Sequence, residues 1–198
     1  MAIGEVVAIG VEQAQRHETA KQAATVWRID PTHASAEFAV RHLMVATVKG
    51  RFSNVQGSIT IDEAHPERSS VEATIDATTV DTHLADRDDH LRSADFLNVE
   101  RYPTLTYRST AVERLDDNLY RILGDLTIRD VTRPVALEAE FHGAVRDPWG
   151  NRKAGVSATG RLNRIDFGLT WNLALETGGF VVGDDVKIAI EFEAIQED

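Results

Sequence analysis

Two histidines flank an alternating stretch of the chain, THASAEFAVRHLMVATVKGRF, which runs from Thr32 to Phe52. Histidine binds metals and transfers protons near neutral pH, so the pair raises the question of a metal site or a catalytic site. His33 and His42 are an odd number of positions apart, and in an unbroken strand such residues face opposite sides of the sheet. A metal held by both would require a bulge, so the spacing argues against a shared site.

The second histidine, His42, is in phase with the apolar residues Phe38 and Val40. This phase predicts that His42 points into the interior of the fold and that Arg41 points outward. An interior histidine is more often a hydrogen-bonded core residue than a ligand. The alternative is that it holds the polar head group of a ligand in a mostly apolar cavity.

The segment DRDDH, from Asp86 to His90, is a second candidate for metal chemistry. It lacks the glycine of a calcium loop and the HExxH spacing of a zinc-binding helix. Its charges are more typical of a solvated helix surface, with Asp86 and His90 as an i,i+4 pair. We therefore expect no metal site and no cofactor.

Sequence motifs of nucleophilic catalysis and of nucleotide binding are absent. There is no GxSxG elbow, no GxxxxGK[ST] loop and no GxGxxG turn, and the chain contains no cysteine. We therefore expect no catalytic residues and no enzyme activity. The alternative is an enzyme that uses His42 as its acid or base.

The composition is typical of a globular protein, with 42% hydrophobic residues among 198. The net charge is −11, and the acidic residues are spread along the chain, so the surface is expected to repel nucleic acids and anionic membranes. No stretch approaches the roughly 18 apolar residues of a membrane span, so no stable membrane insertion is expected.

The N-terminal segment differs in pattern from the rest of the chain. Its short apolar run is broken by Glu5 and Glu12 and lacks the basic start and long apolar middle of a secretory signal, which favours a cytoplasmic location. Residues 1–24 are predicted to form either an amphipathic helix or a loose arm. Residues 25–198 are predicted to form a single barrel domain.

The elements that must position these residues are mainly strands. From Trp27 onward apolar and polar residues alternate, which is the period of a strand with one buried face. Only residues 82–98 have the three-and-four spacing of a helix. About eight strands with one helical insertion predict an all-β, antiparallel barrel, because closure removes exposed sheet edges. The inward positions beyond the first strand include Val55, Ile59, Ile61, Val71, Ala73, Ile75, Ala77, Leu105, Tyr107, Leu126, Ile128, Val135, Leu137, Ala139, Phe141, Val186, Ile188, Ile190 and Phe192.

The interior of such a barrel is either filled by side chains or able to hold one ligand. Several inward positions carry small residues that leave space. The alternative is that neighbouring Phe and Leu side chains fill it, and periodicity alone does not decide between the two. The small residues are Ala36, Ala73, Ala77, Ala139, Ala158 and Gly160.

Five runs together form a recognisable pattern. They are WRIDPTHASAEFAVRHLMVATVKGRF, RDDHLRSADFLNVERYPTLTYRST, GDLTIRDVTRPVALE, NRIDFGL and VVGDDVKIAIEFE. In this order they resemble the YceI-like family over about residues 26–195. The resemblance implies a lipocalin-like antiparallel barrel with a long interior pocket that binds polyisoprenoid chains or related lipids. Many members carry a secretory signal and work in the periplasm, and this chain lacks that signal.

On this basis the expected function is to bind, and to transport or store, a long-chain isoprenoid or related lipid. The alternative is an enzyme that acts on an isoprenoid-like substrate with His42 as its acid or base. Burial of each methylene is worth about 0.8 kcal/mol, so a long chain needs no charged anchor. His42, with Arg51 or Tyr107, is expected to contact the head group. The full set of expected ligand-binding residues is Phe38, Val40, His42, Arg51, Phe52, Ile75, Phe96, Leu105, Tyr107, Leu126, Ile128, Phe141 and Phe167.

The turn Asp147–Asn151 contains a large apolar residue, Trp149, which gains by being covered. We expect it to fold back on the end of the barrel, and an oligomer contact is the alternative. Since family members often pair, a homodimer is expected from the resemblance.

Overall fold

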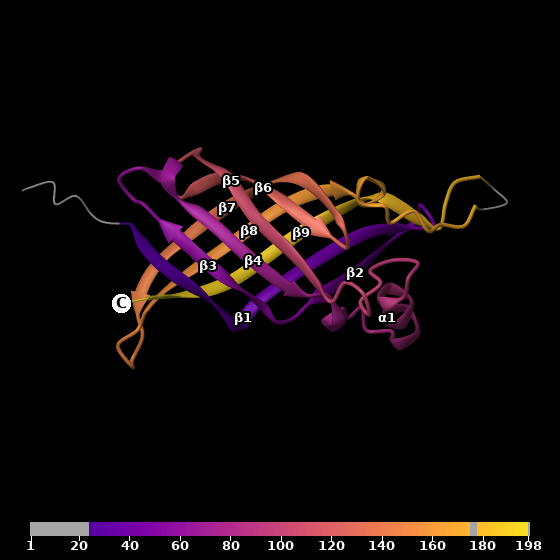
Figure 1. The fold of residues 1–198 in the computed structure, drawn as a ribbon, viewed down its shortest axis with the longest axis horizontal. Helices are drawn as coiled ribbons and strands as arrows, with labels where there is room; N and C mark the ends of the chain where they lie inside the picture. The colour runs from indigo at the N-terminus through magenta and orange to yellow at the C-terminus, as the bar shows by residue number, and fades with distance from the viewer. Residues whose placement is uncertain (1–23, 175–177, 198) are drawn as a thin grey trace, which may run out of the picture.

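A computed structural model of the chain describes residues 24–174 and 178–197. The predicted arm or helix of residues 1–24 lies almost entirely outside these described residues. The described chain is an elongated barrel with one helix, α1, at one end and the C-terminus at the other (Figure 1). Its strands are β1 Thr25–His42, β2 Ala46–Phe52, β3 Val55–Ile61, β4 Ser70–Asp76, β5 Thr104–Arg114, β6 Leu119–Ile128, β7 Val131–Arg146, β8 Arg152–Asn163 and β9 Val182–Gln196.

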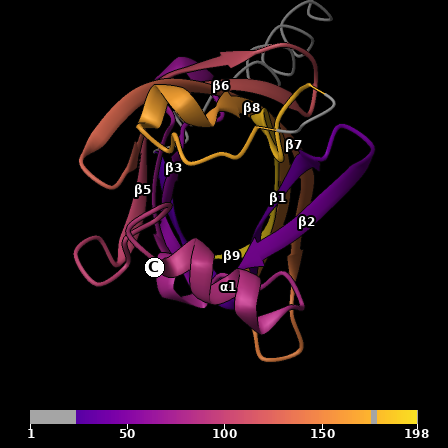
Figure 2. The same cartoon turned by 90° about the vertical axis from the view of Figure 1, so that its right-hand side faces the viewer.

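All strand pairings are antiparallel, and the sheet closes because the first strand, β1, also pairs with the last, β9. The first part of β1 pairs with β3 and its later part with β2, so β2 and β3 together act as one interrupted strand. The result is a closed ring of eight strand positions (Figure 2). The predicted antiparallel barrel of about eight strands is confirmed.

The strands have the period expected from the sequence. In β7, Val135, Leu137 and Ala139 are buried, and the residues between them are exposed. The inner faces of the strands form a large core cluster around Tyr107 and a smaller one around Trp27. The hydrophobic pattern therefore fixes which side chains face the barrel interior.

The helical insertion consists of α1, Ala85–Arg92, preceded by two short 3₁₀ turns at Pro66–Arg68 and Ala77–Thr79; a third follows β8 at Arg164–Phe167. The helix is shorter than the predicted segment 82–98. No helix among the described residues is long and apolar enough to cross a membrane.

The charges of α1 correct one prediction. Asp88 is buried, and its Oδ1 accepts hydrogen bonds from the backbone N and the Oγ1 of Thr82, at 2.8 and 2.5 Å. His90 bonds to Asp95 at 3.0 Å, and the ion pairs of the described residues include no Asp86–His90 pair. The helix thus uses part of its charge to anchor the loop at the barrel end, not only as a solvated surface.

The turn between β7 and β8 corrects a second prediction. Asp147 closes this turn by accepting hydrogen bonds from the backbone N–H groups of Trp149 and Asn151, at 2.9 and 2.8 Å. These bonds hold the turn by itself, and Trp149 is 84% exposed rather than covered by the barrel. The expectation that Trp149 folds back on the barrel end is wrong, and the alternative of an oligomer contact stays a prediction.

Candidate ligand-binding cavity

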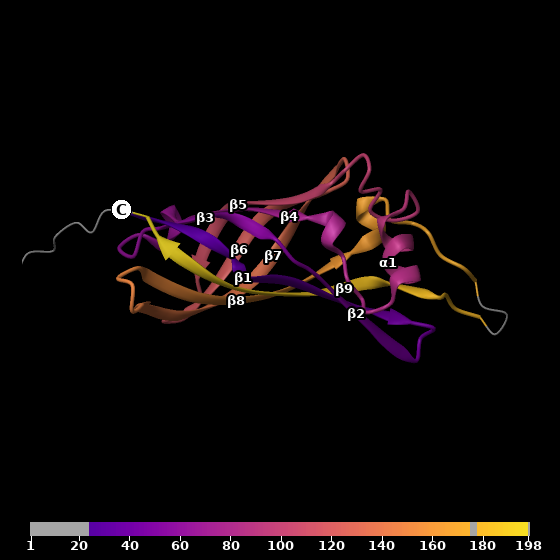
Figure 3. The same cartoon turned by 90° about the horizontal axis from the view of Figure 1, so that it is seen from below.

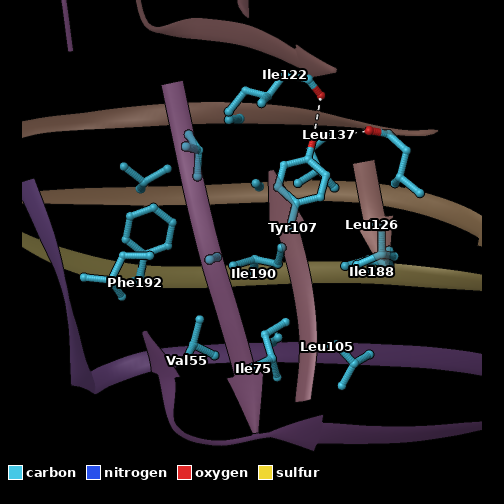
Figure 4. Close-up of a pocket in the computed structure, with 18 of the residues that line it drawn as sticks. Val55, Ile75, Leu105, Tyr107, Ile122, Leu126, Leu137, Ile188, Ile190 and Phe192 are labelled. Atoms are coloured by element: carbon cyan, nitrogen blue, oxygen red, sulfur yellow. Dashed lines mark hydrogen bonds between the residues drawn. The ribbon is translucent and has the colours of Figure 1, made fainter. Parts of the chain in front are cut away.

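A cavity of about 660 Å³ occupies the interior of the barrel. Its volume is within the range of about 300–1,000 Å³ that is usual for small-molecule sites. The strands of the ring all contribute to the wall, and the lining is predominantly apolar. Figure 4 shows part of it, with side chains from β3, β4, β5 and β9 directed toward a common space.

Small residues account for part of this space. Ala36, Ala73, Ala139 and Ala158 all line the cavity. The alternative that Phe and Leu side chains fill the whole interior is therefore wrong. At Gly160, however, a leucine side chain does fill the space: a Cβ at this position would lie 2.7 Å from Cδ2 of Leu137.

Most residues expected to bind ligand have side chains on this inner wall. Their positions place them where a bound chain would lie, and ligand contact itself stays a prediction. The cavity lining includes ten of them: Phe38, Val40, Phe52, Ile75, Phe96, Leu105, Tyr107, Leu126, Ile128 and Phe141.

The other three, His42, Arg51 and Phe167, are not among the lining residues. His42 has the inward phase of Val40, but it is the last residue of β1, in a hairpin that continues beyond the barrel (Figure 3). Arg51 is exposed and pairs with Asp81 at 3.4 Å. Phe167 is 2% exposed and packs in the core beside the cavity. The predicted group of His42 with Arg51 or Tyr107 is not brought together at the cavity.

Tyr107 has its hydroxyl engaged within the barrel wall. The hydroxyl donates to the backbone oxygens of Ile122 and Val135, at 3.1 and 3.2 Å (Figure 4). Burial, with a smaller contribution from the charge of Asp125, raises the pKa of Tyr107 to about 12. The residue offers a ligand its ring rather than a charge.

Arg164, which was not among the expected site residues, lines the cavity at the α1 end and is 3% exposed. Its guanidinium donates to the backbone oxygens of Gly183 (2.9 Å), Trp171 (3.0 Å), Val182 (3.2 Å) and Leu169, and to Asp184 Oδ1 (3.2 Å). Burial lowers the pKa of Arg164, and the charge of Asp184 acts in the opposite direction. The one available sequence signal was its place in the quoted run NRIDFGL.

Charged and polar side chains also line the cavity at the opposite end, near the turns after β3, β5 and β7. Arg152 lies there with its guanidinium carbon 5.4 Å from the ring centroid of Trp27, and it donates to Gln196 Oε1 at 3.1 Å. Both ends of the apolar wall thus carry polar atoms. The remaining residues of this kind at the turn end are Asp62, Glu63, Ser69, Arg114, Asp117 and Tyr120.

One cluster outside the cavity has the residue types of a metal site. The ligand atoms of Asp30, His33 and Glu193 all lie within 4.8 Å of one another. The ammonium of Lys153 is 3.4 Å from Asp30 and 2.9 Å from Glu193, so the carboxylates already have a cation between them. Hydrogen bonds from Thr32, and further ones from His33 and Lys153, hold the pKa of Asp30 well below its usual range, although burial acts the other way. This arrangement is an ion-pair network that joins β1, β8 and β9.

Comparison with known proteins places this barrel in a family. The sequence pattern of the YceI-like domain matches residues 27–194. The protein YceI of Salmonella newport (strain SL254) is 38% identical over 181 residues, which is 90% of this chain and 91% of that protein.

Solved structures share the fold. The Burkholderia cenocepacia protein BcnA superposes with a TM-score of 0.73 at 19% identity, over 83% of this chain and 98% of that one. A polyisoprenoid binding domain from Saccharophagus degradans, implicated in plant cell wall breakdown, superposes with a TM-score of 0.62 at 14% identity, over 86% and 98%.

Proposed function

The chain belongs to the YceI-like family, and from this premise we propose that it binds a long-chain isoprenoid or a related lipid inside the barrel. The observation that carries the proposal is the apolar cavity of about 660 Å³ along the barrel interior. Each methylene transferred from water into such a space contributes about 0.8 kcal/mol, so affinity rises with the length of the buried chain. The polyisoprenoid binding domain of Saccharophagus degradans, which has the same fold, supports this class of ligand.

We propose a binding role rather than catalysis, with transport or storage as its use. No histidine is present among the described residues that line the cavity, and His42, the last residue of β1, is therefore not in the cavity wall. The enzyme alternative therefore has no acid or base from that residue in contact with the cavity. His42→Ala is expected to leave ligand loading unchanged.

The first experiment is native mass spectrometry of the protein purified from its own host, followed by solvent extraction of the bound material. A discrete excess mass that releases a long-chain isoprenoid supports the proposal and identifies the ligand. A protein that is bare and also takes up no added polyprenol overturns it. The same spectra report whether the expected homodimer forms, and fractionation of host cells tests the expected cytoplasmic location.

A pair of variants on one strand locates the binding site. Ala139 and Ala136 are both on β7, but the first lines the cavity and the second is exposed on the outer face. Ala139→Leu fills part of the cavity and is expected to reduce polyprenol uptake. Ala136→Leu adds the same side chain outside and is expected to leave uptake unchanged. Equal uptake by both variants would place the ligand elsewhere.

A further inference from the structure

Exposed apolar residues gather on two loops at the α1 end of the barrel. The β1–β2 turn carries Leu43, Met44 and Val45, of which Met44 is 63% and Val45 80% exposed. Leu173 and Phe180, in the connection from β8 to β9, are 56% and 55% exposed. Both loops extend beyond α1 at the same end of the molecule (Figures 1 and 3). We call these five residues the apolar tip.

The two loops are joined by backbone hydrogen bonds, so the apolar tip is one structure. Leu43 N donates to Val181 O at 2.9 Å, and Val181 N donates to Leu173 O at 3.0 Å. Phe180 pairs with Ala174 in a short bridge. The five side chains are therefore presented together on a bonded framework.

The turn in the apolar tip uses residues that are unfavourable for its conformation. Leu43 and Met44 have φ angles of 51° and 63°. Left-handed backbone of this kind costs roughly 1–2 kcal/mol for an ordinary side chain, and Asn or Gly is the usual choice. The chain thus carries exposed apolar side chains where neither solubility nor turn geometry favours them.

The apolar tip is continuous with the cavity wall. Val40 of β1 and Val182 of β9 both line the cavity, and each strand leads within a few residues into one of the two loops. A chain leaving the cavity at this end would pass directly along the apolar tip. The apolar tip therefore adjoins the cavity wall at this end of the barrel.

Behind the apolar tip, the outer wall of the barrel carries basic residues. Lys49 pairs with Ala39, Ala39 with Lys187, and Lys187 with Arg161, so these positions form one row across β2, β1, β9 and β8. They line an outer groove, to which Arg121 and the acidic residues Glu37 and Glu138 also contribute. We call Lys49, Lys187 and Arg161 the basic row.

None of these three cations is within ion-pair distance of a carboxylate in the described part of the chain. Like charges on directly paired positions, as at Lys187 and Arg161, repel one another. Arg41, closer to the turn, is also exposed, and among the described residues its guanidinium donates to Thr47 Oγ1, at 3.3 Å. The groove is lined by four basic and two acidic side chains, so its local charge is positive and opposite in sign to the net charge of −11.

We propose that the apolar tip and the basic row dock the barrel on a phospholipid bilayer with anionic head groups, where the protein exchanges its lipid. The proposal rests on the proposed function, because docking on a bilayer serves a protein that takes up or releases a lipid. Exposed apolar side chains enter the head-group boundary, and basic residues behind them are attracted by the negative surface potential. Docking of this kind is peripheral and reversible, and the local basic row overcomes the repulsion expected from the average charge.

The test is flotation of the ligand-free protein with vesicles of phosphatidylcholine alone or mixed with phosphatidylglycerol. The tip variant combines Leu43→Asn, Met44→Gly and Val45→Thr. Asn and Gly are favoured at positive φ, so folding is expected to be retained. It should bind mixed vesicles at least roughly tenfold more weakly than the original protein. Trp149→Ser, at the opposite end of the barrel, removes a comparable exposed apolar residue and should not change binding.

A charge variant with Lys49→Glu and Lys187→Glu should lose binding to mixed vesicles and its salt sensitivity, while weak binding to pure phosphatidylcholine remains. The proposal is overturned if the original protein does not float with either vesicle, or if the tip variant floats equally well. A shift in oligomeric state of the tip variant, without any vesicle binding, would assign the surface to a second copy of the chain and also overturn it.

Polyprenol uptake from detergent, measured on the same variants, separates this proposal from the function on which it rests. The tip variant is expected to load normally in detergent, because its changes are outside the cavity lining. Failure of all proteins to load polyprenol would reject the lipid-binding function, whereas normal loading without vesicle binding would reject only the docking.

Discussion

The ring of Tyr107 lies across the position of Gly124, so closely that a Cβ at residue 124 would be 2.5 Å from the ring's Cζ. The two residues are on neighbouring strands, β5 and β6, and the register of this pair shifts between Ser109 and Ala111. The absence of a side chain at Gly124 lets the tyrosine hydroxyl reach the backbone oxygens of Ile122 and Val135. This contact sets the shape of the cavity wall where Tyr107 lines it.

Gly124→Ala is expected to destabilise the barrel by about 1–3 kcal/mol, because the new Cβ meets both the tyrosine ring and the backbone oxygen of Arg108. Equilibrium denaturation in urea measures the change. Gly155→Ala on β8 is the control, since its Cβ would meet nothing closer than 3.6 Å and an ordinary contact results. Equal stability of the two variants would contradict the described packing.

Tyr107→Phe is expected to change how stability depends on pH. The folded pKa of Tyr107, about 12, is above its ordinary value of 10.0. Folding therefore favours the neutral phenol, and this contribution is fully present below pH 10 and is lost as pH rises from 10 toward 12. At neutral pH the free energy of unfolding of the variant should be about 1 kcal/mol lower than that of the original protein, because a hydrogen bond is missing. Above pH 10 the free energy of unfolding should fall less in the variant than in the original protein.

Denaturation curves at neutral and alkaline pH measure both effects. Tyr102→Phe, whose side chain lies outside the cavity lining, reports the background from other titrating groups. If the stability of the Tyr107 variant and that of the original protein fell equally above pH 10, Tyr107 would not titrate as described.

Arg164→Lys is expected to destabilise the α1 end of the barrel by about 3 kcal/mol, because lysine cannot reproduce the fork of a buried guanidinium. The backbone oxygens of Leu169, Trp171 and Gly183 would lose their common donor. Arg161→Lys is the matched control on an exposed site of β8 and should change stability by less than about 0.5 kcal/mol. Hydrogen exchange would show whether the loss is concentrated at the start of β9, as the contacts require.

The sequence predicts the faces of the strands better than the positions along the barrel axis. A period of two determines which side chains share a face, so the inner wall around Leu105 and Leu126 followed from alternation. It does not reveal an irregular register. His42 shares the phase of Val40, but the pairing of β1 with β9 shifts between these two residues, and His42 is not among the cavity-lining residues. The role of Arg164 depends on backbone oxygens from a distant segment, such as Gly183, which no local pattern reveals.

Asp30→Asn is expected to weaken the junction of β1, β8 and β9, and the effect should depend on pH. The hydrogen bonds of Thr32, His33 and Lys153 hold the pKa of Asp30 below its ordinary value, so this carboxylate contributes stability above about pH 4 that is lost as pH falls further. The variant should be less stable than the original protein at neutral pH. The difference between their free energies of unfolding should become smaller in acid. Urea denaturation at both pH values measures this, with Asp185→Asn, an exposed change on β9, as the control. If the difference in free energy of unfolding did not change with pH, the ion-pair network would not depend on the charge of Asp30.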